Sequence, residues 1–450
     1  MTDHEASMRQ EAIHQRNDTA PDILVVGGGP AGSTVAALLA ERGYDVVILE
    51  KSRHPRFHIG ESLLPLNLPL FERLGVAEQV AAIGMLKYGA EFISPDHDQA
   101  SYFDFGQALD KSFPHSYEVR RSDLDEILFK NAVTKGARAR EGCKVTMTEF
   151  PRAQRAIVTS LSEEGQITEW HPRFVVDASG RDTLLANQFG TKQRNRKHAS
   201  AAIYAHYEGA ARRTGREEGN ISLFWFEHGW FWYIPLADGS VSVGAVCWPY
   251  YMKARKVPVE QFFSDTIALC PPLAERLKEA TRASPVSATG NFSYASSRSS
   301  GSNYLMLGDA FAFIDPVFSS GVLLAMNSAF SGAETIDQCL RNPAAASHAL
   351  RNFDRTSRHG LKIFSWIIYR MTTPVMRDMF MHPSNKFRLQ ETLLSVLTGD
   401  LFGDTPIRFR LAIFKFIYYL QSIAMFRESY RAWQRRKRAI REVAANLTAP

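Results

Sequence analysis

The sequence predicts an α/β protein that combines a parallel sheet, an antiparallel sheet layer and a helical C-terminal region. Three observations support this prediction. A short apolar run, a glycine-rich turn and a helical pattern follow one another over residues 22–50. Aromatic-rich runs of alternating polarity fill residues 201–249, which is typical of antiparallel strands. Beyond Asn342 the pattern is mostly helical and is interrupted by prolines and glycines.

The glycine-rich turn has the spacing of a Rossmann-like, dinucleotide-binding βαβ unit. The apolar run 23–26 predicts a buried strand. Three glycines follow at G-x-G-x-x-G spacing, which permits a tight turn, a close approach of a pyrophosphate and close packing of helix on strand. The next helix would direct free N–H groups at the phosphates, and an acidic residue about 20 positions on can bind a ribose. The predicted binding residues are Gly27, Gly29, Pro30, Ala31, Gly32, Glu50 and Lys51.

Shorter patterns predict the remaining elements. Ser122 is the predicted N-cap of a helix over 123–132, because a serine side chain can satisfy free N–H groups at a helix start. Glu164-Gly165 is the predicted turn of a hairpin, and Asp238-Gly239 is a turn inside the antiparallel layer. The other predicted elements are a helix over 66–75, strands over 88–94, 117–121, 174–177 and 304–307, and a helix that starts near Gly321.

These elements divide the chain into four predicted segments. Residues 1–20 are polar, lack the apolar core of a secretory signal and form a flexible N-terminal arm. Residues 21–200 and 285–340 form a discontinuous Rossmann-like domain. Residues 201–284 form an antiparallel-sheet layer that supplies a substrate cavity, and residues 341–450 form the helical C-terminal region.

Composition limits the partners and the compartment. The chain has 450 residues and a formal net charge of +6, with the positive residues gathered near the C-terminus, which argues against a nucleic-acid partner. The four cysteines are widely separated, and His54 and His58 have no partner at metal-binding spacing, so we expect neither disulfides nor a metal site, and a cytoplasmic setting. The apolar run 411–426 contains Lys415 and Gln421, which favours a buried amphipathic helix over a membrane contact.

Three strand ends resemble those of one enzyme superfamily. The glycine motif, the D-A-S-G run at 177–180 and the G-D pair at 308–309 occur in this order in FAD enzymes of the p-hydroxybenzoate-hydroxylase superfamily. The resemblance covers residues 20–335 and implies that FAD is the cofactor. Arg121 matches the arginine that lies beside FAD in these enzymes. The residues that the resemblance adds to the FAD site are Arg121, Asp177, Gly308 and Asp309.

Three further motifs resemble those of the flavin-dependent halogenases within this superfamily. Residues 230–235 read W-F-W-Y-I-P, which matches their W-x-W-x-I-P motif. Lys87 stands downstream of a G-E-S run at 60–62, where these enzymes carry their catalytic lysine. Residues 313–321 match the loop whose last two backbone amides bind halide. The resemblance implies catalytic roles for Lys87, Trp230 and Trp232, a place at the flavin edge for Glu61 and Ser62, and halide binding by Ser320 and Gly321.

The implied reaction is chemically consistent with these residues. Reduced FAD and oxygen supply an electrophilic oxygen, and a chloride or bromide ion held by backbone N–H groups attacks it to give hypohalous acid. Because free hypohalous acid is indiscriminate, a lysine with three donors and a tunable pKa suits its delivery to the substrate. Aromatic walls from Trp230, Trp232 and Phe318 would keep the passage dry. The sequence has no dedicated nicotinamide motif. The resemblance implies that a separate flavin reductase supplies reduced FAD, and direct reduction by NAD(P)H stays open.

Phe318 bears on the identity of the substrate. Tryptophan halogenases have a glutamate at this position, which is taken to assist deprotonation, whereas phenol and pyrrole halogenases resemble the present sequence. The resemblance therefore implies an electron-rich phenol or pyrrole, which in several members is tethered to an acyl or peptidyl carrier protein. Glu61 is a weak candidate for the catalytic base.

The C-terminal end is strongly basic. Because carrier proteins are acidic, this end would help to dock one, although a solvated helix face explains the same charges. The basic residues are Arg427, Arg431, Arg435, Arg436, Lys437, Arg438 and Arg441.

Two other enzyme classes share the scaffold and stay open at this point. An FAD monooxygenase that hydroxylates an aromatic ring needs neither halide nor lysine, and the W-x-W-x-I-P motif argues against it. A geranylgeranyl-reductase-like enzyme has a similar aromatic motif, and apolar C-terminal helices would suit its lipid substrate. The product formed from an electron-rich phenol separates these classes, because only a halogenase brominates it.

Overall fold

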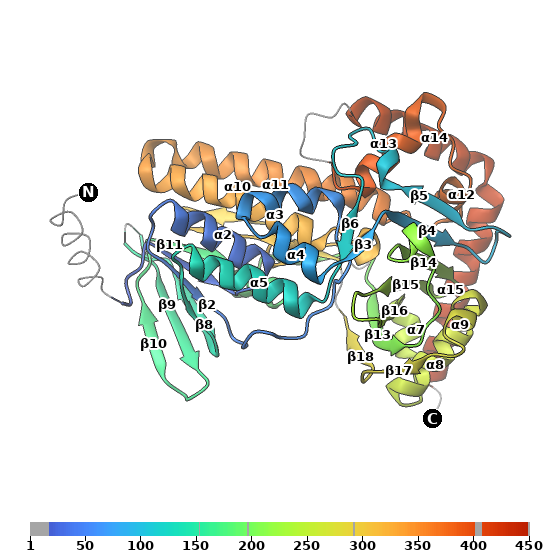
Figure 1. Cartoon of the computed structure of the whole chain (residues 1–450), viewed down its shortest axis with the longest axis horizontal. Coiled ribbons are helices and arrows are strands. Elements are labelled where there is room, and N and C mark those ends of the chain that lie inside the picture. Colours follow the sequence, from blue (N-terminus) through green and yellow to red (C-terminus); the bar gives the residue numbers. More distant parts are fainter. Residues whose placement is uncertain (1–17, 153, 196–197, 291–292, 401–406, 449–450) are drawn as a thin grey trace.

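The computed structural model describes residues 18–448, except for 153, 196–197, 291–292 and 401–406 (Figure 1). Most of the predicted N-terminal arm, residues 1–17, lies outside the described residues. The molecule is elongated, with a parallel sheet and its covering helices at one end and a second sheet at the other. The last helices pass over the second sheet and down its outer side (Figure 1).

The first sheet has six strands in the order β20-β21-β11-β1-β2-β7, and all are parallel except β20. Alternate residues of β1 face opposite sides, because side chains alternate along a strand. Ile23 and Val25 pack against helices, whereas Leu24 and Val26 pack against a separate three-stranded sheet. This sheet carries the predicted hairpin between Ile157 and Trp170. The bounds are β1 (Ile23–Val26), β2 (Val46–Leu49), β7 (Arg138–Arg140), β11 (Phe174–Asp177), β20 (Ser300–Gly301), β21 (Tyr304–Met306), β8 (Cys143–Glu149), β9 (Ile157–Ser162) and β10 (Ile167–Trp170).

The helices over the first sheet include the one that the glycine motif predicts. α2 (Pro30–Glu41) lies beside α5 (Arg121–Thr134) and α10 (Gly321–Arg341) on one face of the sheet (Figure 1). The prediction of Ser122 as an N-cap is wrong. α5 begins at Arg121 with Arg120 as its N-cap, because the Arg121 guanidinium binds Asp125 one turn later and so belongs inside the helix. The neighbouring helices are α3 (Leu68–Leu74), α4 (Ala77–Ile83) and α6 (Leu184–Gln188).

The second sheet is larger than residues 201–284 predict, because two earlier strands join it. Its order is β17-β13-β16-β15-β14-β4-β5, with β18 paired to β13, and β14 pairs with β4 in parallel. Lys87, just before β4 in the sequence, ends a separate short strand, β3, which pairs with β6. The bounds are β3 (Met85–Lys87), β4 (Gly89–Ile93), β5 (Ser101–Asp104), β6 (Ser116–Glu118), β13 (Ala201–Glu208), β14 (Ile221–Phe226), β15 (Gly229–Pro235), β16 (Val241–Cys247), β17 (Thr281–Arg282) and β18 (Ser287–Thr289).

Strand β15 separates two layers of the interior. Trp230 and Trp232 point toward the core shared with the first sheet, whereas Phe231 and Tyr233 point toward the small helices on the other face. The period of two residues therefore sends both tryptophans to the same side. The other helices and strands before the C-terminal region are α7 (Pro249–Lys253), α8 (Val259–Ala268), α9 (Pro271–Arg276), β12 (Lys192–Arg194), β19 (Tyr294–Ser296) and β22 (Ala312–Phe313).

The C-terminal region is helical, as predicted. The prediction of a buried amphipathic helix over 411–426 holds for one face of α14 only: Leu411 and Phe414 are buried, whereas Phe416 and Ile423 are exposed. Among the described residues no single helix is long and apolar enough to cross a membrane, and α14 with the first half of α15 passes that test only as a pair bent by 79°. The bounds are α11 (Ala346–Ile368), α12 (Pro374–Met381), α13 (Leu389–Leu397), α14 (Ile407–Ala424) and α15 (Phe426–Thr448).

Candidate active site

A cavity of about 850 Å³ opens where the carboxyl ends of the central strands of the first sheet meet the tryptophan face of the second. This is the edge at which parallel α/β sheets bind ligands. The predicted residues that line it are Gly27, Gly29, Pro30, Ala31, Glu50, Lys51, Glu61, Ser62, Arg121, Trp230, Trp232, Asp309, Ser320 and Gly321. The predicted residues that do not line it are Gly32, Lys87, Asp177, Gly308 and Phe318.

The glycine turn needs its glycines for close packing. A Cβ on Gly27, whose φ is +101°, would lie 2.4 Å from the Ala178 carbonyl oxygen, and one on Gly32 would lie 1.9 Å from the Gly27 carbonyl oxygen. Gly32 therefore stands behind the cavity wall and lets α2 approach β1. The N-cap residue of α2 is Gly29, which has no side chain to cap the helix, and this helix start faces the cavity with its free N–H groups.

An arginine that the sequence reasoning missed stands beside this turn. Arg56 lines the cavity, its guanidinium donates to Asp125 at 3.0 Å and lies 3.6 Å from Glu50. The Glu50 carboxylate accepts the Gly28 N–H at 2.7 Å and the Ser52 N–H at 2.9 Å, so it is fixed in place. Arg56 lies in a polar loop without a motif, and only the fold brings its positive charge to the place where a pyrophosphate would lie.

Arg121 enters the cavity from the start of α5. Its guanidinium makes a paired contact with Asp125, at 2.9 and 3.1 Å, and donates to the Ile59 carbonyl at 3.0 Å. Burial by itself would raise the pKa of Asp125, but Arg121 and Arg56 more than offset it and hold this pKa below its usual value. Arg121 is therefore positioned by a permanent anion.

Two predicted residues shape the strand ends without touching the cavity. Asp177 is buried and accepts the Ser179 N–H at 3.0 Å and the Leu185 N–H at 2.8 Å, which fixes the turn after β11. Gly308 has φ of +52° and donates its N–H to Ser328. This turn places Asp309 in the cavity wall, where burial raises the pKa of its carboxyl to about 6 while Arg181 and Arg121 oppose the rise.

The side chain of Ser62 separates Lys87 from the cavity. Its side chain is 1% exposed, and its ammonium donates to the Ser62 hydroxyl at 2.6 Å and to the Leu63 carbonyl at 3.0 Å. The Ser319 hydroxyl donates to the same Ser62 oxygen at 2.9 Å. A continuous hydrogen-bonded path therefore leads from Lys87 through Ser62, a cavity-lining residue, to the loop that ends in Ser320.

A second acidic group faces the lysine. A Glu118 carboxylate oxygen lies 3.5 Å from the Lys87 ammonium, and both side chains are completely enclosed. Burial lowers the pKa of Lys87, and Glu118 partly opposes this effect. Burial likewise raises the pKa of Glu118 to about 8, against the pull of Lys87. Both shifts favour the uncharged forms, because a dry site disfavours charge.

The tryptophan pair forms an aromatic wall opposite the glycine turn. The rings of Trp230 and Trp232 lie 6.2 Å apart, and the Trp232 indole N–H donates to Ser242 at 3.2 Å. Gly244 on the neighbouring strand makes room for this indole, since a Cβ there would lie 2.2 Å from it. Phe318 does not line the cavity, because its ring stacks on Phe380 of α12 at 6.1 Å.

The N-terminus of α10 forms another part of the wall. Ser320 and Gly321 line the cavity at the start of a 21-residue helix, and the side chain of Ser320, its N-cap residue, makes no capping hydrogen bond. Free N–H groups and the positive end of the helix dipole favour an anion there. Just before it, Ser319 has φ of +56°, which turns the chain into the helix.

Glu61 has a partner that the sequence reasoning missed. The His206 ring nitrogen Nε2 lies 3.0 and 3.1 Å from the two Glu61 carboxylate oxygens, and both side chains are buried. His206 comes from β13 and Glu61 from the segment before α3, so no local pattern links them. The pairing engages Glu61 and so weakens its candidacy as a free base.

The donor set fits FAD. Glu50 suits a ribose, Arg56 and the start of α2 suit a pyrophosphate, and Asp309 suits ribityl hydroxyls. The tryptophan wall suits the apolar face of an isoalloxazine ring. The residues present therefore match both the polar and the aromatic ends of this cofactor.

Comparison of the sequence with known proteins also indicates an FAD site. Residues 20–358 match the family model of the FAD binding domain. A tryptophan 2-halogenase of Chondromyces crocatus is 33% identical over 74% of this chain and 64% of its own length. A 1H-pyrrole-2-carbonyl peptidyl-carrier-protein chlorinase of Pseudomonas fluorescens is 28% identical over 85% of this chain and 90% of its own length.

A solved structure covers nearly the whole molecule. The myxobacterial chondrochloren halogenase CndH is 31% identical, covers 90% of this chain and 97% of its own, and superposes with a TM-score of 0.76. Its reported class, FAD-dependent halogenases, agrees with the three motifs around the cavity. The FAD fold, the cofactor and the enzymatic class follow from these matches, and the chain belongs to the flavin-dependent halogenase family.

Proposed function

We propose that this halogenase uses reduced FAD and molecular oxygen to oxidise chloride or bromide to hypohalous acid and delivers it by way of Lys87 to an electron-rich phenol or pyrrole. The observation that carries the proposal is the path from the Lys87 ammonium through the Ser62 hydroxyl to the loop before α10. It joins the predicted halogen carrier to the predicted halide site within one wall of the cavity.

Each part of the wall has a task in this proposal. The cofactor supplies an electrophilic oxygen. The N–H groups of Ser320 and Gly321 hold the halide beside it, because an uncapped helix start favours an anion. Trp230 and Trp232 exclude water from the passage.

Lys87 receives the halogen once the Ser62 side chain turns aside. Burial lowers the pKa of its ammonium group, which favours the neutral, nucleophilic amine. Glu118 is placed to accept the proton that the Lys87 ammonium loses when it becomes a neutral amine, since the two groups lie 3.5 Å apart.

The test uses purified protein with reduced FAD, oxygen, bromide, catalase and an electron-rich phenol. We expect brominated product by mass spectrometry and a loss of at least about 100-fold in Lys87→Met. Since that variant leaves Glu118 unpaired in a dry site, Lys87→Met with Glu118→Gln is compared with Glu118→Gln alone. A hydroxylated phenol, or full bromination in the double variant, would contradict the proposal.

The substrate class rests on two observations. Phe318 provides no carboxylate, which suits rings that release a proton from their own O–H or N–H, and one relative is a pyrrole chlorinase. Another relative is a tryptophan 2-halogenase, so free tryptophan is the rival substrate. Phenol, pyrrole and tryptophan are therefore offered together, and we expect tryptophan to react most slowly.

We further propose that the substrate is tethered to an acyl or peptidyl carrier protein and that a separate reductase supplies reduced FAD. The pyrrole relative acts on a carrier-bound substrate, and basic side chains of α15 would attract an acidic carrier. The four cysteines are buried free thiols, which fits the reducing cytoplasm as the site of the reaction.

A further inference from the structure

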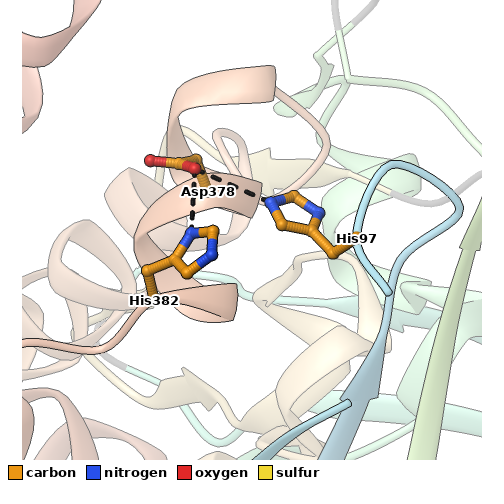
Figure 2. A group of neighbouring side chains, drawn as sticks. All are labelled: His97, Asp378 and His382. Carbon is orange, nitrogen blue, oxygen red and sulfur yellow. Dashed lines mark hydrogen bonds and ion pairs between the residues drawn. The ribbon is translucent and has the colours of Figure 1, made fainter. Parts of the chain in front are cut away.

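A cluster of two histidines and one aspartate lies where the loop between β4 and β5 meets α12. His97 lies in the loop between β4 and β5, Asp378 lies in α12, and His382 caps the end of the same helix. One ligand atom from each residue lies within 4.8 Å of the others. Figure 2 shows both imidazole rings turned toward the Asp378 carboxylate. None of the three lines the flavin cavity.

We propose that His97, Asp378 and His382 bind a divalent metal ion of the zinc class. The Asp378 Oδ1 atom lies 3.6 Å from His97 Nε2 and 3.1 Å from His382 Nδ1. In a tetrahedral zinc site, with bonds of about 2.0–2.1 Å, neighbouring ligand atoms lie about 3.3 Å apart. The three residues therefore need shifts of only a few tenths of an ångström at these two pairs to share one ion.

Two outer hydrogen bonds orient the ligands. The His97 Nδ1 atom lies 2.9 Å from the Ser94 hydroxyl, which turns Nε2 toward the site. Asp378 accepts a hydrogen bond from Gln421 of α14 on its other oxygen, Oδ2, at 2.5 Å, which leaves Oδ1 for a metal. Metal-binding histidines and carboxylates are commonly held by such partners, because these fix the tautomer and the direction of the lone pair.

The local charges and exposure suit a cation with one open position. Arg377, which precedes Asp378 in the sequence, binds Asp96 of the loop that carries His97. The side chain of His97 is 15% exposed and that of His382 is 69% exposed. The ion would take two imidazoles and one carboxylate from the protein and a water from the open side.

Binding would fasten the C-terminal helices to the second sheet. Phe380, between Asp378 and His382, packs on Phe92 and Phe103 of β4 and β5 at 4.9 and 5.3 Å, and stacks on Phe318 beside the halide loop. A metal would close the outer end of this aromatic layer by linking α12 to the β4–β5 loop. Its effect is therefore on stability, and it is separate from the halogenase reaction.

The test is zinc binding by the full chain after treatment with a chelator. At pH 7.5 we expect calorimetry to show one Zn²⁺ per chain. Saturating zinc should raise the Tm by several degrees, and Co²⁺ should give the visible absorption of a tetrahedral site. His382→Ala, which removes an exposed ligand, should weaken binding at least tenfold.

The matched control is His171→Ala, which removes another exposed histidine, 3.1 Å from Glu169. It should bind zinc like the parent. The metal-free Tm of His382→Ala checks that the fold is intact, and His97→Gln serves as a second ligand variant if it is not. Equal zinc affinity in the ligand variants and the control, or no binding by the parent, would overturn the site and leave the cluster as carboxylate–histidine pairs.

Discussion

Among the single residues of the cavity, two arginines are held in place by ion pairs with buried carboxylates. Arg121 and Arg56 share Asp125, and Arg56 also approaches Glu50. Such an arrangement keeps both guanidinium groups in fixed directions before a ligand arrives, which lowers the cost of binding an anion.

Arg56 provides a direct test of the cofactor site. We expect Arg56→Met to weaken FAD binding about tenfold to 100-fold, because a hydrogen bond to a charged group contributes about 1.5–3 kcal/mol. Asp125 keeps Arg121 as a partner in this variant, so the fold should persist. Arg53→Met is the matched control, since Arg53 lies in the same loop but binds Glu163 on the surface. Equal FAD affinity in the two variants, measured by fluorescence titration, would exclude Arg56 from the site.

Asp315 predicts a pH effect on stability. Burial raises the pKa of its carboxyl to about 6, against hydrogen bonds from Ser200 and Val317. An unfolded aspartate titrates near pH 4, so between about pH 4 and 6 the folded protein holds a proton that the unfolded chain releases. Stability therefore falls as the pH rises through this window.

Asp315→Asn removes this ionisation and keeps the shape of the side chain. We expect the Tm of the flavin-free variant to fall less than that of the parent from pH 4.5 to 7, by a few degrees. Thermal unfolding followed by circular dichroism measures the difference. Other buried acids are present in both proteins and affect both Tm values alike. If the Tm of the two proteins changes with pH in the same way, the role given to Asp315 is contradicted.

At the scale of elements, glycine decides how closely α2 approaches β1. We expect Gly32→Ala to abolish FAD binding and to lower the Tm, because its Cβ would lie 1.9 Å from the Gly27 carbonyl oxygen. Gly321→Ala is the control at the other helix start, since no heavy atom outside its own neighbourhood lies within 4 Å of the added Cβ. FAD absorbance after gel filtration and a melting curve measure both effects. A flavin-loaded Gly32→Ala would refute the close-packing argument.

In strand β15, the alternation of side chains between the two faces decides which residues reach the cavity. Trp230 and Trp232 reach the cavity because they share a face, and Phe231 stays in the opposite core. Gly244 on β16 leaves space for one indole. The motif is therefore a strand pattern whose function depends on the neighbouring strand.

At the scale of the whole molecule, α15 presents exposed positive charge beside the second sheet. Arg436 is an exception, because its guanidinium lies 4.0 Å from the Trp248 ring centre and burial lowers its pKa. A charge-reversal test should therefore spare Arg436 and use its exposed neighbours.

We expect Arg435→Glu with Arg438→Glu to raise the KM for a carrier-tethered substrate about tenfold, since rim charges steer association. Turnover of a free phenol should be unchanged. Lys130→Glu with Lys278→Glu is the matched control, because these side chains are 70% and 66% exposed and the change in net charge is the same. An equal KM in both double variants would remove the docking role of α15.

The features that depend on a few consecutive residues can be predicted from the sequence. The glycine turn, the strand ends at Asp177 and Gly308, and the helix start at Gly321 each need only a few consecutive residues, and the structure has all of them. The same holds for the tryptophan pair, because a strand period of two fixes which residues share a face.

The contacts between residues far apart in the sequence could not be predicted and are seen first in the fold. Arg56 joins the site across a loop, His206 reaches Glu61 from 145 residues away, and Lys87 lies behind Ser62 instead of in the open cavity. The second sheet takes β4 and β5 from another part of the chain, and the His97 cluster forms across 281 residues between its loop and α12. Long-range contacts of this kind depend on how whole layers pack, and no local pattern of residues carries that information.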